Sequence, residues 1–237
     1  MALPKVGYPT YALELPSTGK TVKYRPFLVK EEKVLLMALE GKDEKNIVNA
    51  VKDLIKNCVI SRIKVETLPS FDLEYLFLKI RAASIGEVIT LSVTCLDDNK
   101  TTVDTEININ EVEVKKEKGH NTKILFDKNM GIVMRYPSMK EFIDREFLQK
   151  EMKTDQVYDF ISDSIDQIFD AEEVYDKTTT TKKEFREFVD GLTTKQFEKI
   201  QQFYSTAPKL SHTFKVKNPN TGVESDYTIE GLQSFFA

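Results

Sequence analysis

The spacing of apolar residues changes along this chain, and each change restricts the fold. Three early segments carry apolar residues at helical intervals: 29–41, 43–59 and 71–84. Two pairs of alternating segments predict β-hairpins: 10–15 with 21–27, and 87–95 with 101–109. The first pair flanks a turn that contains Pro16 and Gly19. Because both periods occur, the sequence predicts a mixed α+β fold.

The second half of the chain returns to helical spacing. Ser138 and Glu141 form an S-x-x-E capping pattern at the start of the first of these helices. The expected helices are 138–152, 154–170, 181–192 and 193–208. A terminal hairpin (210–216 with 223–229) and a short closing helix (230–237) follow. We also expect short runs at 111–116 and 121–127 to extend the sheet formed by 87–109, with a further strand at 131–137.

This pattern predicts two portions. Residues 1–136 would form an α+β portion with a hairpin, three helices and a β-sheet, and residues 137–237 a helical portion with a closing hairpin and short helix. The threonine tract at 177–183 is the best linker candidate.

Composition excludes several classes of function. The net charge of −4 argues against nucleic acid as a partner, and we interpret the small basic cluster at 114–120 as a solvated loop. Cys58 and Cys95, the two cysteines, lie in apolar segments, which is typical of a reducing compartment. The N-terminus lacks the apolar region of a signal peptide, and no stretch reaches the ~18 apolar residues of a membrane span. We therefore expect a soluble intracellular protein.

The patterns that resemble catalytic or ligand sites have simpler explanations. Gly19-Lys20-Thr21 matches the end of a phosphate-binding loop, but Glu14 stands where that loop needs its first glycine. His120 and His212, the two histidines, are not paired in sequence with a carboxylate or a nucleophile. A run of acidic residues is spaced for a solvated helix face: Asp155, Asp159, Asp163, Asp166, Asp170, Glu172, Glu173 and Asp176. The sequence therefore predicts no enzyme, no cofactor and no small-molecule substrate.

One stretch near the end of the chain has the outline of a zinc knuckle without its cysteines. Residues 218–222, Asn-Pro-Asn-Thr-Gly, match the Cys-Pro-x-Cys-Gly pattern, with Asn218 and Thr221 at the ligand positions. The hairpin at 87–109 supplies Cys95 alone, because Asp98 stands where a second cysteine would be. One thiolate with Asp98 and the remote His212 is a poor ligand set for zinc. The stretch is predicted to be a turn, with no metal.

Several long segments, ordered along the chain, resemble the sequences of a known family. They are LPSTGKTVKYRPFLVKEEKVLLMALEG (15–41), IVNAVKDLIKNC (47–58), LPSFDLEYLFLKIRAASIGEVITL (68–91), LTTKQFEKIQQFYSTAPKLSHTFKV (192–216) and IEGLQSFF (229–236). Over most of its length the chain resembles the baseplate hub family of T-even-type contractile-tailed bacteriophages. Some members of that family carry Cys-x-x-Cys turns at the hairpin tips, of which this chain keeps only Cys95.

The resemblance implies a non-enzymatic role in assembling the central hub of the tail baseplate, through contacts with other tail and hub proteins. Two forms of this role stay open: a transient assembly factor in the host cytoplasm, or a permanent hub subunit in the virion. A metal- or nucleotide-dependent enzyme with a site assembled from distant residues is the alternative from another class. Leu232, Phe235 and Phe236 are the candidate partner contact, unless they close the protein's own core.

Overall fold

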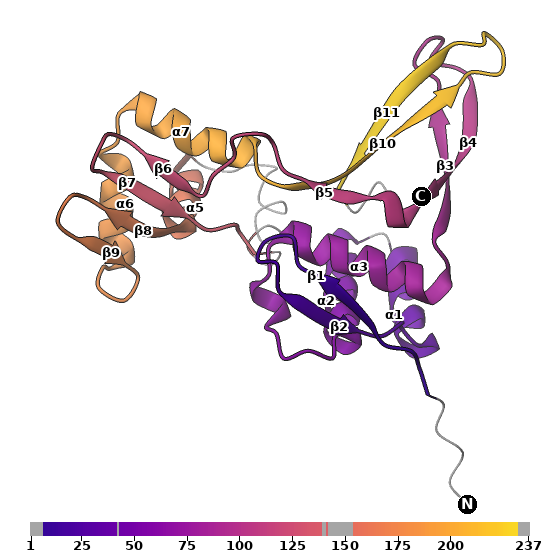
Figure 1. Ribbon diagram of the computed structural model, residues 1–237, viewed down its shortest axis with the longest axis horizontal. Coiled ribbons are helices and arrows are strands. Elements are labelled where there is room, and N and C mark those ends of the chain that lie inside the picture. The colour runs from indigo at the N-terminus through magenta and orange to yellow at the C-terminus, as the bar shows by residue number, and fades with distance from the viewer. Residues whose placement is uncertain (1–6, 42, 139–140, 142–153, 232–237) are drawn as a thin grey trace, which may run out of the picture. The chain divides into compact units, whose positions relative to one another are not determined.

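The computed structural model describes residues 7–41, 43–138, 141 and 154–231. Contacts divide the chain into two compact units, which are coloured by residue number in Figure 1. The first unit comprises Met1–Lys115 and Lys209–Ala237, and the second comprises Lys116–Pro208. The second unit is therefore inserted into the first, between two strands that pair with each other. The boundary expected at residue 136 falls inside the second unit.

The first unit combines helices with hairpins and a small sheet. Its helices are α1 (Val29–Glu40), α2 (Glu44–Cys58) and α3 (Ser70–Ile85), with 3₁₀ turns at Val65–Thr67 and Ile109–Glu111. Its strands are β1 (Tyr11–Glu14), β2 (Thr21–Tyr24), β3 (Val88–Thr94), β4 (Thr102–Asn108), β5 (Glu113–Lys115), β10 (Lys209–Lys217) and β11 (Glu224–Glu230). Strands β1 and β2 form one hairpin, β3 and β4 another, and β11-β10-β5 an antiparallel sheet.

Helix α3 is the centre of the first unit, because apolar side chains surround nearly its whole circumference. Leu78 and Ala82 pack against inward-facing residues of the hairpins and the adjoining turn: Ile89, Leu91, Ile107, Ile109, Val112 and Leu210. At the other end, the buried Asp72 carboxylate accepts hydrogen bonds from the backbone N–H and hydroxyl of Ser17 in the β1–β2 turn. The helices predicted over 29–41, 43–59 and 71–84 and the three predicted hairpins of this unit are confirmed.

The second unit packs helices on one four-stranded antiparallel sheet of order β6-β7-β8-β9. The strands are β6 (Lys123–Leu125), β7 (Gly131–Met134), β8 (Ile165–Phe169) and β9 (Val174–Asp176). The helices are α5 (Thr154–Ser164), α6 (Lys182–Asp190) and α7 (Thr194–Ser205). Thr181 caps α6 and Thr193 caps α7, each through its side-chain oxygen.

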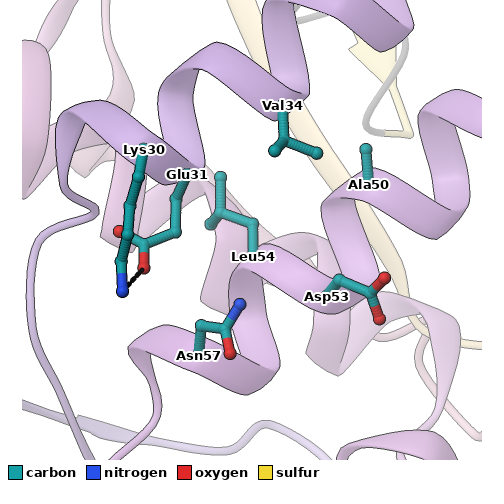
Figure 2. Close-up of a pocket in the computed structure, with 7 residues that line it drawn as sticks. All are labelled: Lys30, Glu31, Val34, Ala50, Asp53, Leu54 and Asn57. Carbon is teal, nitrogen blue, oxygen red and sulfur yellow. Dashed lines mark ion pairs between the residues drawn. The ribbon is translucent and has the colours of Figure 1, made fainter.

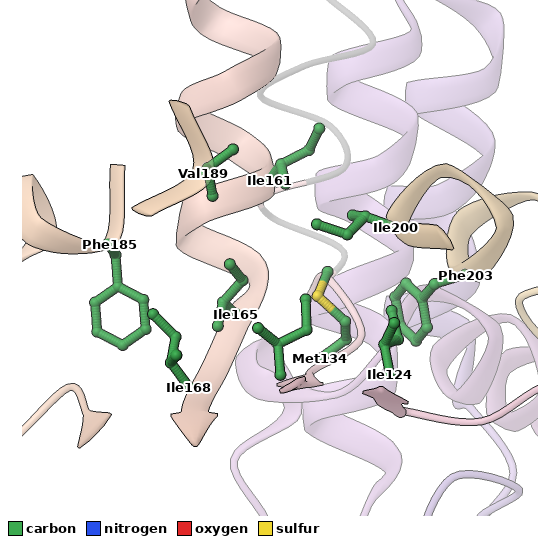
Figure 3. Close-up of a cluster of buried hydrophobic side chains, with 10 residues drawn as sticks. Ile124, Met134, Ile161, Ile165, Ile168, Phe185, Val189, Ile200 and Phe203 are labelled. Carbon is green, nitrogen blue, oxygen red and sulfur yellow. The ribbon is translucent and has the colours of Figure 1, made fainter. Parts of the chain in front are cut away.

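Figure 3 shows the core of the second unit, in which side chains from the sheet and from α5, α6 and α7 converge. Its members include Ile132 and Ile165, together with Ile124, Met134, Ile161, Ile168, Phe185, Val189, Ile200 and Phe203. Strand β7 lies so close to β6 that a Cβ atom on Gly131 would clash with the Ile124 carbonyl oxygen. Glycine is therefore required inside this strand.

Three sequence-based expectations are wrong in detail. The helix expected over 154–170 ends at Ser164, because Ile165–Phe169 pairs with β7 as a strand. The runs at 111–116 and 121–127 do not extend the β3–β4 hairpin, since β5 pairs with β10 and β6 pairs with β7. The threonine tract at 177–183 is not a linker, because it connects β9 to α6 within the second unit. Mixed α+β, the predicted fold class, is confirmed.

Other expectations concern residues outside the described part. The closing helix expected over 230–237 falls almost wholly there, as do Leu232, Phe235 and Phe236. The S-x-x-E pattern is described: Glu141 accepts a hydrogen bond from the Ser138 backbone N–H at 2.8 Å, and the Glu141 N–H donates to the Ser138 hydroxyl at 3.3 Å. Among the described residues, no helix combines the length and apolar character needed to cross a membrane.

Candidate functional site

The tips of two hairpins meet at the position where the sequence suggested a knuckle. The β3–β4 turn (95–101) and the β10–β11 turn (218–223) are more than a hundred residues apart in sequence, yet their side chains are joined by hydrogen bonds. Figure 1 shows the two hairpins side by side within the first unit. We call this contact the hairpin-tip junction.

Asn218 is the centre of the hairpin-tip junction. Its side-chain amide donates to both carboxylate oxygens of Asp97, at 3.0 and 3.1 Å, and to Asp98 at 3.1 Å. The Thr221 hydroxyl donates to Asp97 at 2.5 Å, and the Asn220 amide donates to the Thr101 hydroxyl at 2.9 Å. Asn218 itself is 1% exposed, whereas Asp97, Asn220 and Thr221 lie at the surface of the junction. Both carboxylates therefore have neutral donors as partners.

These donors change the acidity of the junction. The pKa of Asp98 lies far below its ordinary value, first because Thr101 donates through its hydroxyl and backbone N–H, and also because the Lys100 N–H and Asn218 donate. The pKa of Asp97 is lowered by the hydrogen bonds from Asn218 and Thr221. Cys95 lies buried beside them, and burial together with both carboxylates raises the pKa of its thiol. A raised thiol pKa disfavours the thiolate that metals bind.

The structure therefore brings the knuckle positions together as a polar contact. Asn218 and Thr221 occupy the ligand positions of one turn, and both donate protons, which is the opposite of what a metal ligand does. His212 is not part of the junction, because it lies far along β10, opposite Ile229. Within the described residues, no group of three or more His, Cys, Asp or Glu side chains is arranged to hold a metal ion.

A tyrosine adds a second connection between the hairpins. The Tyr227 hydroxyl donates to the Thr94 carbonyl oxygen at 2.9 Å and accepts from the Leu96 N–H at 2.8 Å. Its ring stacks on Phe214 of the neighbouring strand. No sequence pattern pointed to Asp97 or Tyr227, because neither lies at a recognised motif position.

The remaining sequence candidates lie elsewhere. Gly19 and Lys20 belong to the turn of the β1–β2 hairpin, as expected. His120 is buried, with its ring nitrogens in contact with the Thr206 and Tyr136 hydroxyls at 2.8 and 2.9 Å, and burial lowers the pKa of its imidazole. Cys58 is a buried core residue whose thiol pKa is raised to about 11, mainly by burial.

The acidic run is not one solvated helix face. Asp155 and Asp159 on α5 both contact the Arg186 guanidinium of α6, and Asp163 contacts Lys182. The residues from Asp166 onward lie on strands and turns, because the helix ends at Ser164. Part of the run therefore pairs α5 with α6, which the helical spacing alone did not predict.

A shallow groove lies between α1 and α2 in the first unit (Figure 2). Its volume is about 360 Å³, and its floor is apolar, formed by Val34, Ala50 and Leu54. At its edges lie Asp53 and Lys30, whose ammonium pairs with the Glu31 carboxylate at 3.5 Å. The groove therefore combines an apolar floor with charged edges.

A buried ion pair fixes the first turn of α1 beside this groove. The Arg25 guanidinium donates to Glu31 at 3.1 and 3.4 Å, and to the carbonyl oxygens of Pro26 and Asn57. Glu31 also accepts from the Leu28 N–H at 2.6 Å. Burial raises the pKa of Glu31, but the hydrogen bonds from Arg25 and Leu28 outweigh it, so the pKa is lowered.

The outer face of α1 is apolar and exposed. Val29, Leu36 and Met37 are 80%, 52% and 61% exposed. Several large apolar side chains exposed together on one helix form the kind of patch that marks contact sites in soluble proteins. The sequence contains the signal, since apolar residues in 29–40 do not keep to one face.

The protein belongs to the mixed α+β class. Its most distinctive surfaces are the exposed apolar residues of α1 and the groove beside them. A family model described as T4 bacteriophage base plate protein matches residues 8–237. Because the match spans nearly the whole sequence, the chain belongs to this family of base plate proteins. Comparison with curated proteins and with solved structures found no match.

Proposed function

We propose that this protein takes part in assembling the central hub of the tail baseplate, through contacts with other baseplate proteins and without catalysis. The observation that carries the proposal is the match to the base plate family over residues 8–237. The exposed apolar face of α1 and the groove beside it support a role in protein contacts.

The role can be transient or permanent. An assembly factor acts in the host cytoplasm and leaves, whereas a hub subunit remains in the virion. The test is quantitative mass spectrometry of purified virions beside the lysate of infected cells. Abundance in the lysate with absence from virions supports the assembly factor, and a virion stoichiometry like that of hub proteins supports the permanent subunit. Association with no other tail component in the lysate overturns the proposal.

The contact with hub partners is proposed to use Leu232, Phe235 and Phe236 at the C-terminus. Large apolar and aromatic side chains commonly dominate interface energetics. The test is co-purification of hub proteins with a Phe235→Ser/Phe236→Ser variant. We expect the partners to be lost while the circular dichroism spectrum stays that of the parent. If the spectrum and the unfolding midpoint collapse together with binding, these residues close the core instead.

The absence of catalysis is proposed on the chemistry of the hairpin-tip junction. Its donors, Asn218 and Thr221, satisfy the carboxylates that a metal would need. Elemental analysis and nucleotide-shift assays on the purified chain test this point. A stoichiometric metal, or a nucleotide that raises the melting temperature, would support the enzyme alternative instead.

A further inference from the structure

The exposed face of α1 carries a pattern of charge that is complementary to itself. Val29, Lys33, Leu36 and Glu40 are all exposed and follow one another at intervals of four, three and four residues. This spacing keeps them on one line of the helix surface, as in the seam of two packed helices. Met37 is exposed beside that line.

The two charges of the line lie at equal distances on either side of Leu36 and Met37. Lys33 and Glu40 are seven residues, or about 10 Å, apart along the helix, with Leu36 and Met37 midway between them. Within the described residues neither charge has an ion-pair partner. A basic end and an acidic end around an apolar centre is the arrangement that an antiparallel copy of the same helix would complement.

We propose that α1 is a self-association surface, on which a second copy of this chain packs its own α1 antiparallel about a two-fold axis at Leu36 and Met37. In this arrangement Lys33 faces Glu40 of the partner subunit, and Glu40 faces Lys33 of the partner subunit. A two-fold axis requires a self-complementary patch, and this face has one. The apolar centre buries Leu36 and Met37 against their symmetry mates.

The size of the face determines how strong the association is. Helix α1 has 12 residues and is about 18 Å long, so one helix pair buries less surface than a permanent dimer needs. The dimer is therefore weak and concentration-dependent, and α1 is available to exchange partners. The inference does not rest on the proposed role in hub assembly, since it follows from the face of α1 alone.

Charge reversal tests the geometry directly by sedimentation velocity over a range of concentrations. Lys33→Glu places like charges opposite Glu40 of the partner subunit at two symmetric positions, and Glu40→Lys does the same with lysines. We expect each single variant to weaken dimerisation by about tenfold or more. The double variant Lys33→Glu/Glu40→Lys restores dimerisation, because both pairs return with reversed sign.

Mixing the two single variants is the most specific test of the proposed pairing. Lys33→Glu combined with Glu40→Lys forms a heterodimer with both ion pairs, although neither variant dimerises well alone. A protein that remains monomeric at every concentration overturns the proposal, and so does a double variant that does not recover. Specific binding of a different baseplate protein to α1, with no dimer of this chain, assigns the face to that partner and also overturns it.

A disulfide test locates the axis. Met37→Cys lies at the proposed two-fold axis, so oxidation should produce a covalent dimer at concentrations where the parent associates. Val34→Cys is the matched control, since Val34 is exposed on the same helix but lies toward the groove. The native Cys58 and Cys95 are buried and give little background. Equal cross-linking at both positions contradicts the proposed register.

Discussion

The buried ion pair between Arg25 and Glu31, at the first turn of α1, gives the most direct test of what stabilises the first unit. In the variant Glu31→Ala, the Arg25 guanidinium loses both of its contacts with the carboxylate, at 3.1 and 3.4 Å. The Leu28 N–H loses its acceptor at the first turn of the helix. Residue Arg25 is 7% exposed, so its charge stays largely buried after the partner is removed.

The expected loss follows from the contacts that remain. Removing one member of a buried ion pair costs about 3–5 kcal/mol, because a charge is left without its counter-ion. Arg25 keeps the carbonyl oxygens of Pro26 and Asn57, which places the expected loss near the lower end of that range. We therefore expect Glu31→Ala to lower the free energy of unfolding of the first unit by about 3 kcal/mol.

The assay is urea unfolding followed by circular dichroism, with Cys58 labelling as a local probe in a Cys95→Ser background. Cys58 is fully buried beside Arg25, at 3.7 Å from the guanidinium nitrogen, so its labelling reports opening of this region. Glu32→Ala is the matched control, one residue along the same helix, and should change stability by less than about 0.5 kcal/mol.

The double variant Arg25→Met/Glu31→Leu shows whether the loss of stability comes from an unpaired buried charge or from packing at this position. With both charges removed, no buried charge is left unpaired, so most of the loss should be recovered. If Glu31→Ala costs no more than the Glu32→Ala control, the ion pair does not hold α1 and the reasoning is refuted. A double variant as unstable as the single one would show that packing, and not charge, determines the loss.

The same pair predicts a dependence on pH. The pKa of Glu31 is lower in the folded protein than in the unfolded chain. Its contribution is therefore fully present above the unfolded pKa, about 4.3, and is lost as the pH falls through the depressed folded value. The difference in stability between the parent and Glu31→Ala should shrink as the solution is acidified below pH of about 4.

Three further changes test the other unit and the junction. Ile165→Ala removes a fully buried side chain and should cost about 2–5 kcal/mol in urea unfolding, while Ile165→Val should cost about 1 kcal/mol. Gly131→Ala forces a Cβ atom into backbone and should lower the melting temperature clearly, at a cost of about 1–3 kcal/mol. Asn218→Ala leaves two carboxylates without their shared donor and should speed thiol labelling of Cys95, more than Asn220→Ala does. An unchanged labelling rate would mean that the remaining contacts, from Thr221, Asn220 and Tyr227, hold the hairpin tips without Asn218.

The helices and hairpins of the first unit could be predicted from the sequence because their cause is local. Apolar residues at helical spacing in 43–59 have one buried face, and alternation in 87–109 matches the two faces of a hairpin. The capping threonines act on backbone groups three residues away. Base plate family membership was also readable, since it depends on ordered strings along the chain.

Other features depended on partners far away in sequence. Ile165–Phe169 has the apolar content of either a helix or a strand. It forms a strand because it pairs with the free edge of β7. Strand β5 pairs with β10 because the chain returns after the second unit, which no local pattern records. The sequence placed Asn218 and Thr221 at the two ligand positions of a knuckle outline, but it did not show that they meet Asp97.

The sequence by itself therefore determined the periods, the turns and the family, because short-range geometry fixes each of them. The tertiary structure alone decided which strands pair, which charges are buried and which apolar face stays exposed. The reason is physical: Glu31 and Glu32 are neighbours of the same type in one helix, yet only Glu31 meets a buried guanidinium. Such differences in burial and partner arise only when distant segments pack together.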